Sequence, residues 1–212
     1  MTQTTDQSSN GANEVLRCSM RSRRRRIPKS TRIAYDESIR QHVLQFIEAR
    51  HINSVAGFWP IDGEPDIIPL FKKLLARKKK IALPIVSGNN DHTMKFHLWQ
   101  TDTVLRCNRY GICEPQDSAQ VDLADFDLLL MPLVAWDRQG NRIGMGSGYY
   151  DRHLEKFRNS HSPLRLGIGY SMQELDLIRK NDWDIPLHAI VNEHGCLTFD
   201  NEILNSIKRR DE

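Results

Sequence analysis

Long apolar segments are missing from this chain. Its richest apolar run, residues 128–136, is nine residues long, well short of the roughly 20 that a membrane-spanning helix needs. The polar start of the chain also lacks the apolar core of a secretory signal peptide. We therefore expect a cytoplasmic protein without a membrane partner.

Cysteine is scarce, and its spacing is irregular. The four cysteines form no C-x-x-C pair, and scattered cysteines in a chain of this size are typical of reduced thiols in a cytoplasm. The sequence also lacks a Walker A loop, the G-x-G-x-x-G dinucleotide spacing and a recognisable Ser-His or Cys-His pair. Catalysis by a protein nucleophile is therefore not indicated.

Positive charge is concentrated near the start of the chain. Residues 1–32 hold eight basic side chains against Asp6 and Glu14, a net charge of +6, whereas the other 180 residues carry a net charge of −3. On a helix Arg17, Arg21 and Arg24 would share one face, so that three guanidinium groups could converge on phosphates. A solvated tract or a nonspecific contact with RNA explains the same pattern and stays open.

The length and the hydrophobic pattern predict one α/β domain. A chain of 212 residues, of which 39% are apolar, suits a single core, with residues 1–13 as a disordered tail and 14–212 as the domain. Apolar runs that predict strands alternate with amphipathic segments that predict helices, which favours a Rossmann-like three-layer α/β/α fold with a mostly parallel sheet. The strands are expected at 54–60, 81–86, 94–99, 128–135, 165–170 and 189–192, and the helices from Ser30 onward, after Pro65, at 149–157 and at 172–179.

A glycine-rich loop is the most informative segment. In Arg142-Ile-Gly-Met-Gly-Ser-Gly-Tyr-Tyr-Asp-Arg152, three glycines alternate between an expected strand and an expected helix. Glycine lets backbone amides approach an anion closely, so the loop is a candidate phosphate cradle flanked by two arginines. Asp151 is the nearest carboxylate for a magnesium ion. A ligand-free turn, and a pairing of Asp151 with Arg152, remain alternatives.

A second candidate site follows the first expected strand. In Trp59-Pro-Ile-Asp-Gly-Glu-Pro-Asp66, the loop rather than a helix orients Glu64, at a position where open α/β sheets bind ligands. Its carboxylate could accept hydrogen bonds from a heterocycle, or it could face solvent near a helix N-terminus. Met94, Phe96 and Trp99 could form an apolar wall for a flat ring, or they could simply be core residues.

Taken in order, these segments resemble the 5-formyltetrahydrofolate cyclo-ligase family, also called methenyltetrahydrofolate synthetases, over about residues 15–200. The motifs that carry the resemblance are Arg17 to Arg21, Gly63 to Leu70, Leu83-Pro84, Met94 to Trp99, Arg142 to Arg152 and Trp183 to His188. The resemblance implies the fold class of sugar-phosphate isomerases and CoA-transferase subunits. It also implies ATP- and Mg²⁺-dependent closure of 5-formyltetrahydrofolate to 5,10-methenyltetrahydrofolate, with release of ADP and phosphate.

The resemblance also assigns roles to residues of this sequence. Charge stabilisation would come from Arg142 and Arg152, and the metal would be held by Asp151 and Asp184. ATP would contact Arg17, Arg21, Arg142, Ile143, Gly144, Met145, Gly146, Ser147, Gly148, Tyr149 and Tyr150. The folate would lie against Trp59, Glu64, Met94, Phe96, Trp99, Tyr149 and Tyr150.

Three positions depart from the family pattern. Arg17 stands where lysine is frequent, Ser147 replaces the usual glycine or lysine, and Trp183 replaces a histidine before Asp184. None of them removes a group that the chemistry requires. We expect a monomer that acts on a small molecule and binds no nucleic acid, with an RNA-binding protein or an ATP-independent sugar-phosphate isomerase as the alternatives.

Overall fold

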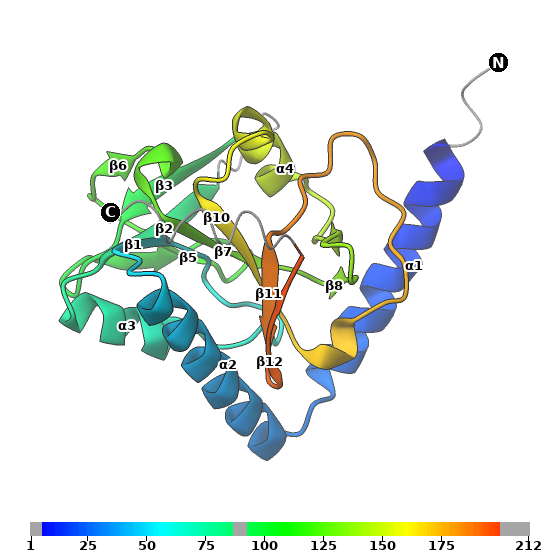
Figure 1. Cartoon of the computed structure of the whole chain (residues 1–212), viewed down its shortest axis with the longest axis horizontal. Coiled ribbons are helices and arrows are strands. Elements are labelled where there is room, and N and C mark those ends of the chain that lie inside the picture. Colours follow the sequence, from blue (N-terminus) through cyan, green and yellow to red (C-terminus); the bar gives the residue numbers. More distant parts are fainter. Residues whose placement is uncertain (1–5, 87–92, 200–212) are drawn as a thin grey trace.

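A computed structural model describes residues 6–86 and 93–199 of the chain. Its centre is an eight-stranded sheet in which the five strands from β11 to β2 run parallel and the edge strands run antiparallel to their neighbours (Figure 1). The strand order across the sheet is β12 (Gly195–Thr198), β11 (Ala189–Asn192), β10 (Leu164–Ile168), β7 (Leu128–Pro132), β1 (Ser54–Ala56), β2 (Lys80–Val86), β3 (Met94–Leu98) and β6 (Gln120–Val121).

Helices cover both faces of this sheet, which confirms the predicted three-layer α/β/α fold. One face packs against α2 (Lys29–Ala49) and α3 (Ile68–Ala76), and the other packs against α4 (Tyr149–Leu154) and the 3₁₀ turn η2 (Glu155–Phe157). Beside the sheet lie a first helix and shorter elements: α1 (Asp6–Arg25), the hairpins β4 (Leu105–Cys107) with β5 (Cys113–Pro115) and β8 (Ala135–Trp136) with β9 (Arg142–Ile143), and the 3₁₀ turns η1 (Leu123–Asp125) and η3 (Ser171–Gln173).

The helix expected at 172–179 does not form. Only the turn η3 is present, and the main chain beyond it runs on without helical structure. The N–H of Leu175 donates to the carbonyl of Trp136 (2.8 Å), and that of Ile178 donates to the carboxylate of Asp137 (2.9 Å). Because these amides bond to the β8–β9 hairpin, they are not available for a helical ladder.

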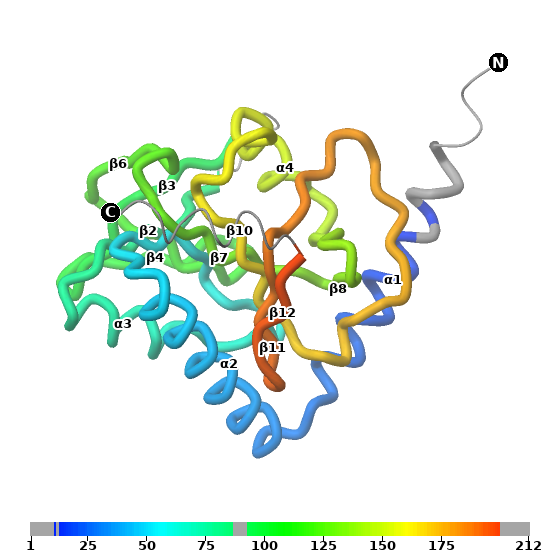
Figure 2. Tube along the Cα trace, viewed as in Figure 1, coloured from blue at the N-terminus to red at the C-terminus, as the bar shows by residue number. Residues whose placement is uncertain are grey.

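Helix α1 begins at Asp6, so part of the segment expected to be a disordered tail is described as helical. Residues 1–5 and 200–212 lie outside the described residues. In Figure 2, α1 lies beside the segment that follows η3. Met20 of α1 packs with Val134 and Ile178 in a small buried cluster. Leu16 of α1 also packs against this cluster, which helps to hold the helix against the domain.

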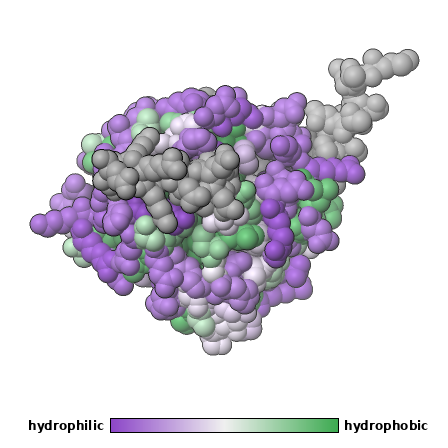
Figure 3. Space-filling view, in the orientation of Figure 1, coloured by the Kyte–Doolittle hydropathy of each residue, from purple (hydrophilic) through white to green (hydrophobic). Residues whose placement is uncertain are grey.

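The surface of the molecule is mainly polar. On the face drawn in Figure 3, hydrophilic residues outnumber the hydrophobic patches between them. Of the helices within the described ranges, none combines the length and the apolar character that crossing a membrane requires.

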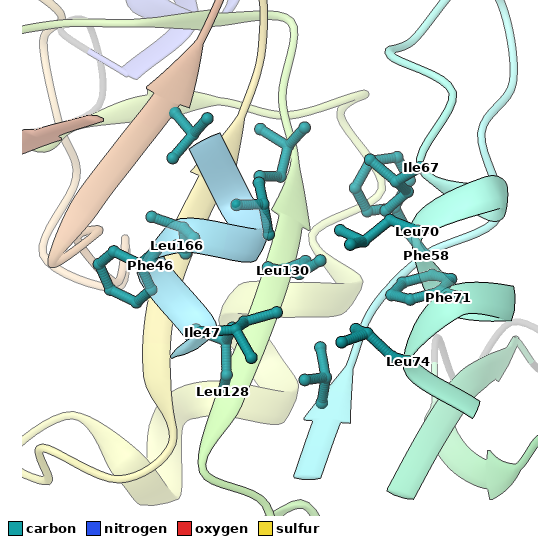
Figure 4. Close-up of a cluster of buried hydrophobic side chains, with 14 of the residues drawn as sticks. Phe46, Ile47, Phe58, Ile67, Leu70, Phe71, Leu74, Leu128, Leu130 and Leu166 are labelled. Carbon is teal, nitrogen blue, oxygen red and sulfur yellow. The ribbon is translucent and has the colours of Figure 1, made fainter. Parts of the chain in front are cut away.

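The main core lies between the sheet and helices α2 and α3 (Figure 4). Strand β7 explains the long apolar run in the sequence, because Leu128 and Leu130 enter this cluster while Leu129 and Met131 enter the cluster on the opposite face. The buried apolar residues of α2 begin only at Ile39: they are Ile39, Val43, Phe46 and Ile47. The predicted helix is confirmed, but Ile33 is 58% exposed and Pro28, not Ser30, precedes the first turn.

Candidate active site

A cavity of about 880 Å³ opens at the carboxyl ends of three parallel strands. Residues that follow β1 and β7, and the last residues of β2, line its floor. Helix α1, the glycine-rich loop and the segment 178–184 line its walls. The carboxyl edge of a parallel sheet is where α/β folds bind ligands, so this cavity is the candidate active site.

The glycine-rich loop, residues 144–148, connects β9 to α4 and forms one wall. Gly146 has φ +102° and Gly148 has φ +64°, both in the region that favours glycine. Arg17 of α1 donates from Nε to the carbonyl of Gly144 (3.0 Å), and Arg152 of α4 donates to the carbonyl of Ser147. Two guanidinium groups therefore bracket the loop, and such groups are frequent partners of phosphate.

Arg142 connects this loop to the opposite wall. Its side chain is only 5% exposed; Nη2 donates to Asp151 Oδ1 (2.7 Å), and Nη1 donates to the carbonyl of Ile185. Asp151 Oδ1 also accepts the N–H of Ile185 (3.1 Å). The alternative partner of Asp151, Arg152, is wrong: the carboxylate pairs with Arg142.

The two predicted metal ligands line the same cavity. Asp184 uses Oδ2 to accept the N–H of Asn181 (2.7 Å), and Asp151 uses Oδ1 for both of its bonds. In each carboxylate, these hydrogen bonds therefore use one oxygen and leave the other to face a ligand. Among the residues that the structure describes, no group of three His, Cys, Asp or Glu side chains could hold a metal ion alone.

Glu64 lies in the same cavity but is buried. Its side chain is 4% exposed, and Oε2 accepts the N–H of Ile61 (3.0 Å) within a tight turn. Burial raises the pKa of Glu64 to about 7, although the charge of Arg24 and the hydrogen bond from Ile61 favour the ionised form. Burial and the negative charge of Glu64 also raise the pKa of Tyr150. The carboxyl group is therefore poised to titrate near neutrality.

Arg24 has a different role from the one its helical position suggests. With its side chain 1% exposed, it donates to the carbonyls of Asp62 and Leu133 (both 3.1 Å) and pairs with the Asp62 carboxylate (3.3 Å). Its Nη1 lies 3.9 Å from Glu64 Oε1. The expectation that it binds phosphate with Arg17 and Arg21 is thus wrong, because it lies beneath the cavity and joins α1 to two strand ends.

Asp62 is the site residue whose partners sequence reasoning missed. It pairs with Arg21 (2.7 Å) and Arg25 (3.3 Å) as well as Arg24. Burial raises its pKa, but the hydrogen bond from Arg21 and the three positive charges outweigh burial and lower it. Asp62 therefore stays ionised and joins the basic end of α1 to the loop that carries Glu64.

The expected aromatic wall is only partly present. Trp59, Met94, Tyr149 and Tyr150 line the cavity, whereas Phe96 and Trp99 do not. Phe96 is 1% exposed and packs against the ring of His153, with centroids 5.4 Å apart. Trp99 packs behind Trp59, with centroids 6.3 Å apart. As strand β3 runs away from the cavity, only its first residue reaches it.

The β4–β5 hairpin adds residues that the sequence did not indicate. Its tip supplies Tyr110 and Ile112 to the cavity, and a disulfide joins Cys107 to Cys113. The antiparallel register places these two cysteines opposite each other. The expectation of four reduced thiols is therefore wrong; within the described part of the chain, the free cysteines are Cys18 and Cys196. The cytoplasmic location, which rested partly on those thiols, stays a prediction.

The sequence profile of the 5-formyltetrahydrofolate cyclo-ligase family matches residues 9–193. The chain belongs to this family. The resemblance noted in the sequence is thereby confirmed.

Cyclo-ligases of known sequence and structure support this membership. A 5-formyltetrahydrofolate cyclo-ligase of Haemophilus influenzae is 35% identical over 158 residues, which cover 74% of this chain and 84% of the relative. That of Escherichia coli K12 is 33% identical over 66% of this chain and 77% of the relative. These names confirm that the chain is an enzyme of the ligase class.

The solved structures agree with the fold. The NMR structure of Aquifex aeolicus 5,10-methenyltetrahydrofolate synthetase has a TM-score of 0.78 and is 30% identical, with 89% of this chain and 93% of that chain covered. A Mycoplasma pneumoniae 5,10-methenyltetrahydrofolate synthetase, 24% identical, has the same fold with a TM-score of 0.69 over 85% of this chain and 98% of that one.

Proposed function

We propose that this cyclo-ligase converts 5-formyltetrahydrofolate to 5,10-methenyltetrahydrofolate with ATP and Mg²⁺. One observation carries the proposal: a single cavity contains both a buried carboxyl group, Glu64, and a glycine-rich loop bracketed by Arg17 and Arg152. A heterocycle and a polyphosphate have room to bind there side by side. The names of the relatives supply the same substrate.

The loop end of the cavity suits the phosphates of ATP. Arg17, Arg21, Arg142 and Arg152 all line it, and guanidinium groups match phosphate oxygens in geometry and charge. Arg17 and Arg152 already donate to the carbonyls of Gly144 and Ser147, so these oxygens are not left bare toward the phosphates. ATP would contact Arg17, Arg21 and the loop from Arg142 to Tyr150.

The carboxylates beside this loop suit a magnesium ion. Mg²⁺ is usually held by one or two carboxylates together with substrate phosphate oxygens. Asp151 and Asp184, which line the cavity and each retain an uncommitted oxygen, provide such a pair. The ion would neutralise phosphate charge and orient the transferred phosphoryl group.

The folate end of the cavity is enclosed and aromatic. Glu64 would accept hydrogen bonds from the pterin, and Trp59, Met94 and a tyrosine of the 149–150 pair would contact the ring. An isosteric amide at position 64 would keep the Ile61 bond but lose the charge. Phe96 and Trp99 would not contact the folate, because they pack behind the residues that line the cavity.

The reaction then needs positioning rather than a protein nucleophile. The formyl oxygen attacks the γ-phosphorus of ATP, the bond to the β-phosphate oxygen breaks, and ADP leaves. N10 attacks the activated formyl carbon and loses its proton, after which the C–O bond breaks and phosphate leaves with the electron pair. Arg142 and Arg152 offset the negative charge that develops on the transferred group.

An absorbance assay for the methenyl product tests this proposal. Purified protein, 5-formyltetrahydrofolate and Mg²⁺ should give a rising signal only when ATP is present. Glu64→Gln should abolish the rise while ATP binding persists, because the substituted side chain lies at the folate end. No ATP-dependent rise from the folded protein would contradict the assignment, and an isomerase or a binding protein would then be favoured.

A further inference from the structure

A second cavity, of about 300 Å³, lies at the opposite end of the parallel strands. Arg165, at the start of β10, and His188, just before β11, both line it. The segment 158–161, which follows η2, closes one side. None of the residues assigned to the ATP, folate or magnesium sites lines this cavity.

The lining of the second cavity is cationic. Arg158, His161, Arg165 and His188 supply basic groups, and Asn159 and Ser160 supply polar ones, whereas no Asp or Glu is among the described residues that line it. The Nδ1 atom of His188 accepts the main-chain N–H of Arg165 (3.1 Å). The rings of His161 and His188 lie 6.5 Å apart.

Arg165 is the strongest indication of a ligand. The residue is 3% exposed, and its Nε and Nη1 donate to the carbonyls of Pro186 (2.9 Å), Ser160 (3.1 Å) and Phe157 (3.3 Å). No carboxylate within the described part of the chain forms an ion pair with it. The carbonyl dipoles that meet Nε and Nη1 leave a full positive charge buried, and such a charge favours an anion nearby.

Arg158 stands at the exposed side of the same cavity. Its Nε and Nη2 donate to the carboxylate of Glu155 (3.2 and 2.9 Å), and its side chain is 33% exposed. An exposed ion pair of this kind contributes little stability and is readily exchanged. The guanidinium group can therefore turn to an incoming anion at small cost.

We propose that the second cavity binds a phosphate group, either as inorganic phosphate or as part of a small phosphorylated metabolite. Arg165 supplies the buried charge and Arg158 the exposed one, and His161 and His188 complete the basic lining. The site is separate from the glycine-rich loop and does not depend on the cyclo-ligase reaction. Because Arg165 and Arg142 hold the adjacent carbonyls of Pro186 and Ile185, the two cavities share one stretch of main chain.

Amide NMR of the full chain can test the second cavity without an activity assay. Inorganic phosphate is titrated at constant ionic strength, with sodium chloride as the compensating salt. Saturable shifts are expected at the amides of 159–162 and 187–188, distinct from shifts in the loop 144–148. A parallel titration with glycerol 3-phosphate distinguishes the two ligands. A site for phosphorylated metabolites should bind glycerol 3-phosphate more tightly than inorganic phosphate, and a site for inorganic phosphate should not.

Matched variants then decide the assignment. Arg158→Gln should raise the Kd for phosphate, measured from the shifts at 159–162, about tenfold, the effect of losing one charged hydrogen bond. His161→Gln, which changes another accessible residue of the lining, should also raise this Kd. Arg152→Gln removes a cation beside the other cavity and should leave those shifts in place. Saturable shifts that are absent, or unchanged in both Arg158→Gln and His161→Gln, would overturn the proposal. Both variants change accessible side chains, so the test does not depend on replacing the buried Arg165.

Discussion

At the scale of single residues, Glu64 is a carboxyl group whose environment changes its chemistry. Burial raises its pKa from 4.5 to about 7. The native state then binds a proton that the unfolded state releases at a lower pH. Stability from this group is fully present below pH 4.5 and is lost as the pH rises through about 7.

Replacing Glu64 by glutamine should therefore change how stability depends on pH. At pH 8 we expect Glu64→Gln to be more stable than the wild type by about 1–3 kcal/mol, since it buries no charge while Ile61 keeps an acceptor. Towards pH 4.5 the two curves should converge. Denaturant unfolding at several pH values measures the difference.

A control for this experiment is Glu155, an exposed carboxylate. The hydrogen bond from Arg158 lowers the pKa of Glu155, so Glu155→Gln should not gain stability as the pH rises. A stability difference for Glu64→Gln that is the same at pH 5 and pH 8 would show that its carboxyl group does not titrate in this range.

The sequence predicted which residues line the cavity better than it predicted which side chains those residues contact. Glu64 and Arg142 are predicted because loops with glycine or proline hold polar side chains at strand ends, and Arg17 is predicted from the face of a basic helix. All three line the cavity. Arg24 was misassigned because helical periodicity gives its face but not what meets it. Its partner Asp62 lies 38 residues away in sequence, a contact that only the tertiary fold creates.

At the scale of elements, buried strands were easier to predict than short helices. Strands β7, β10 and β11 follow the predicted apolar runs because both of their faces are covered. The segment 172–179 has an apolar pattern that fits a helix, but its amides bond to the β8–β9 hairpin instead. Intrinsic preference was overridden by a tertiary contact.

The glycine-rich loop contains positions with different tolerance for a side chain. Gly148 has φ +64°, and a Cβ atom there would lie 3.0 Å from the guanidinium of Arg152, whereas at Gly144 nothing lies within 4 Å. Gly148→Ala should therefore lower the unfolding free energy by about 1 kcal/mol and displace Arg152. Thermal unfolding should show a fall in Tm of about 2–4 °C.

Gly144→Ala is the matched control for this loop, because its added methyl group meets no atom. It should keep the wild-type Tm. Equal losses of stability in Gly144→Ala and Gly148→Ala would mean that the loop does not have the backbone conformation described here.

At the scale of the whole molecule, the concentration of positive charge at the start of the chain acquires an explanation. Arg21, Arg24 and Arg25 pair with one carboxylate, Asp62. Arg32 donates to main-chain carbonyls at the end of α1. Much of the basic tract is therefore engaged within the molecule, which argues against the alternative of an RNA-binding surface.

Ligand-induced stabilisation distinguishes the two uses of this charge. A ligand that binds only the native state at 100 times its Kd stabilises that state by about 2.7 kcal/mol, a rise in Tm of about 5–10 °C for a chain of this size. We expect Mg²⁺-ATP to raise the Tm in this way. A short RNA at the same phosphate concentration should not, and any small effect it has should vanish with added salt.

Variants of two arginines test whether the rise in Tm with Mg²⁺-ATP comes from binding in the cavity. Arg142→Gln removes a buried cation from the cavity wall and should abolish most of the rise with Mg²⁺-ATP. Arg138→Gln removes a 72% exposed cation that pairs with Glu174 outside the cavity and should leave the rise intact. If RNA raised the Tm as much as ATP, or if both variants lost the rise equally, net positive charge rather than the glycine-rich loop would be binding the phosphates.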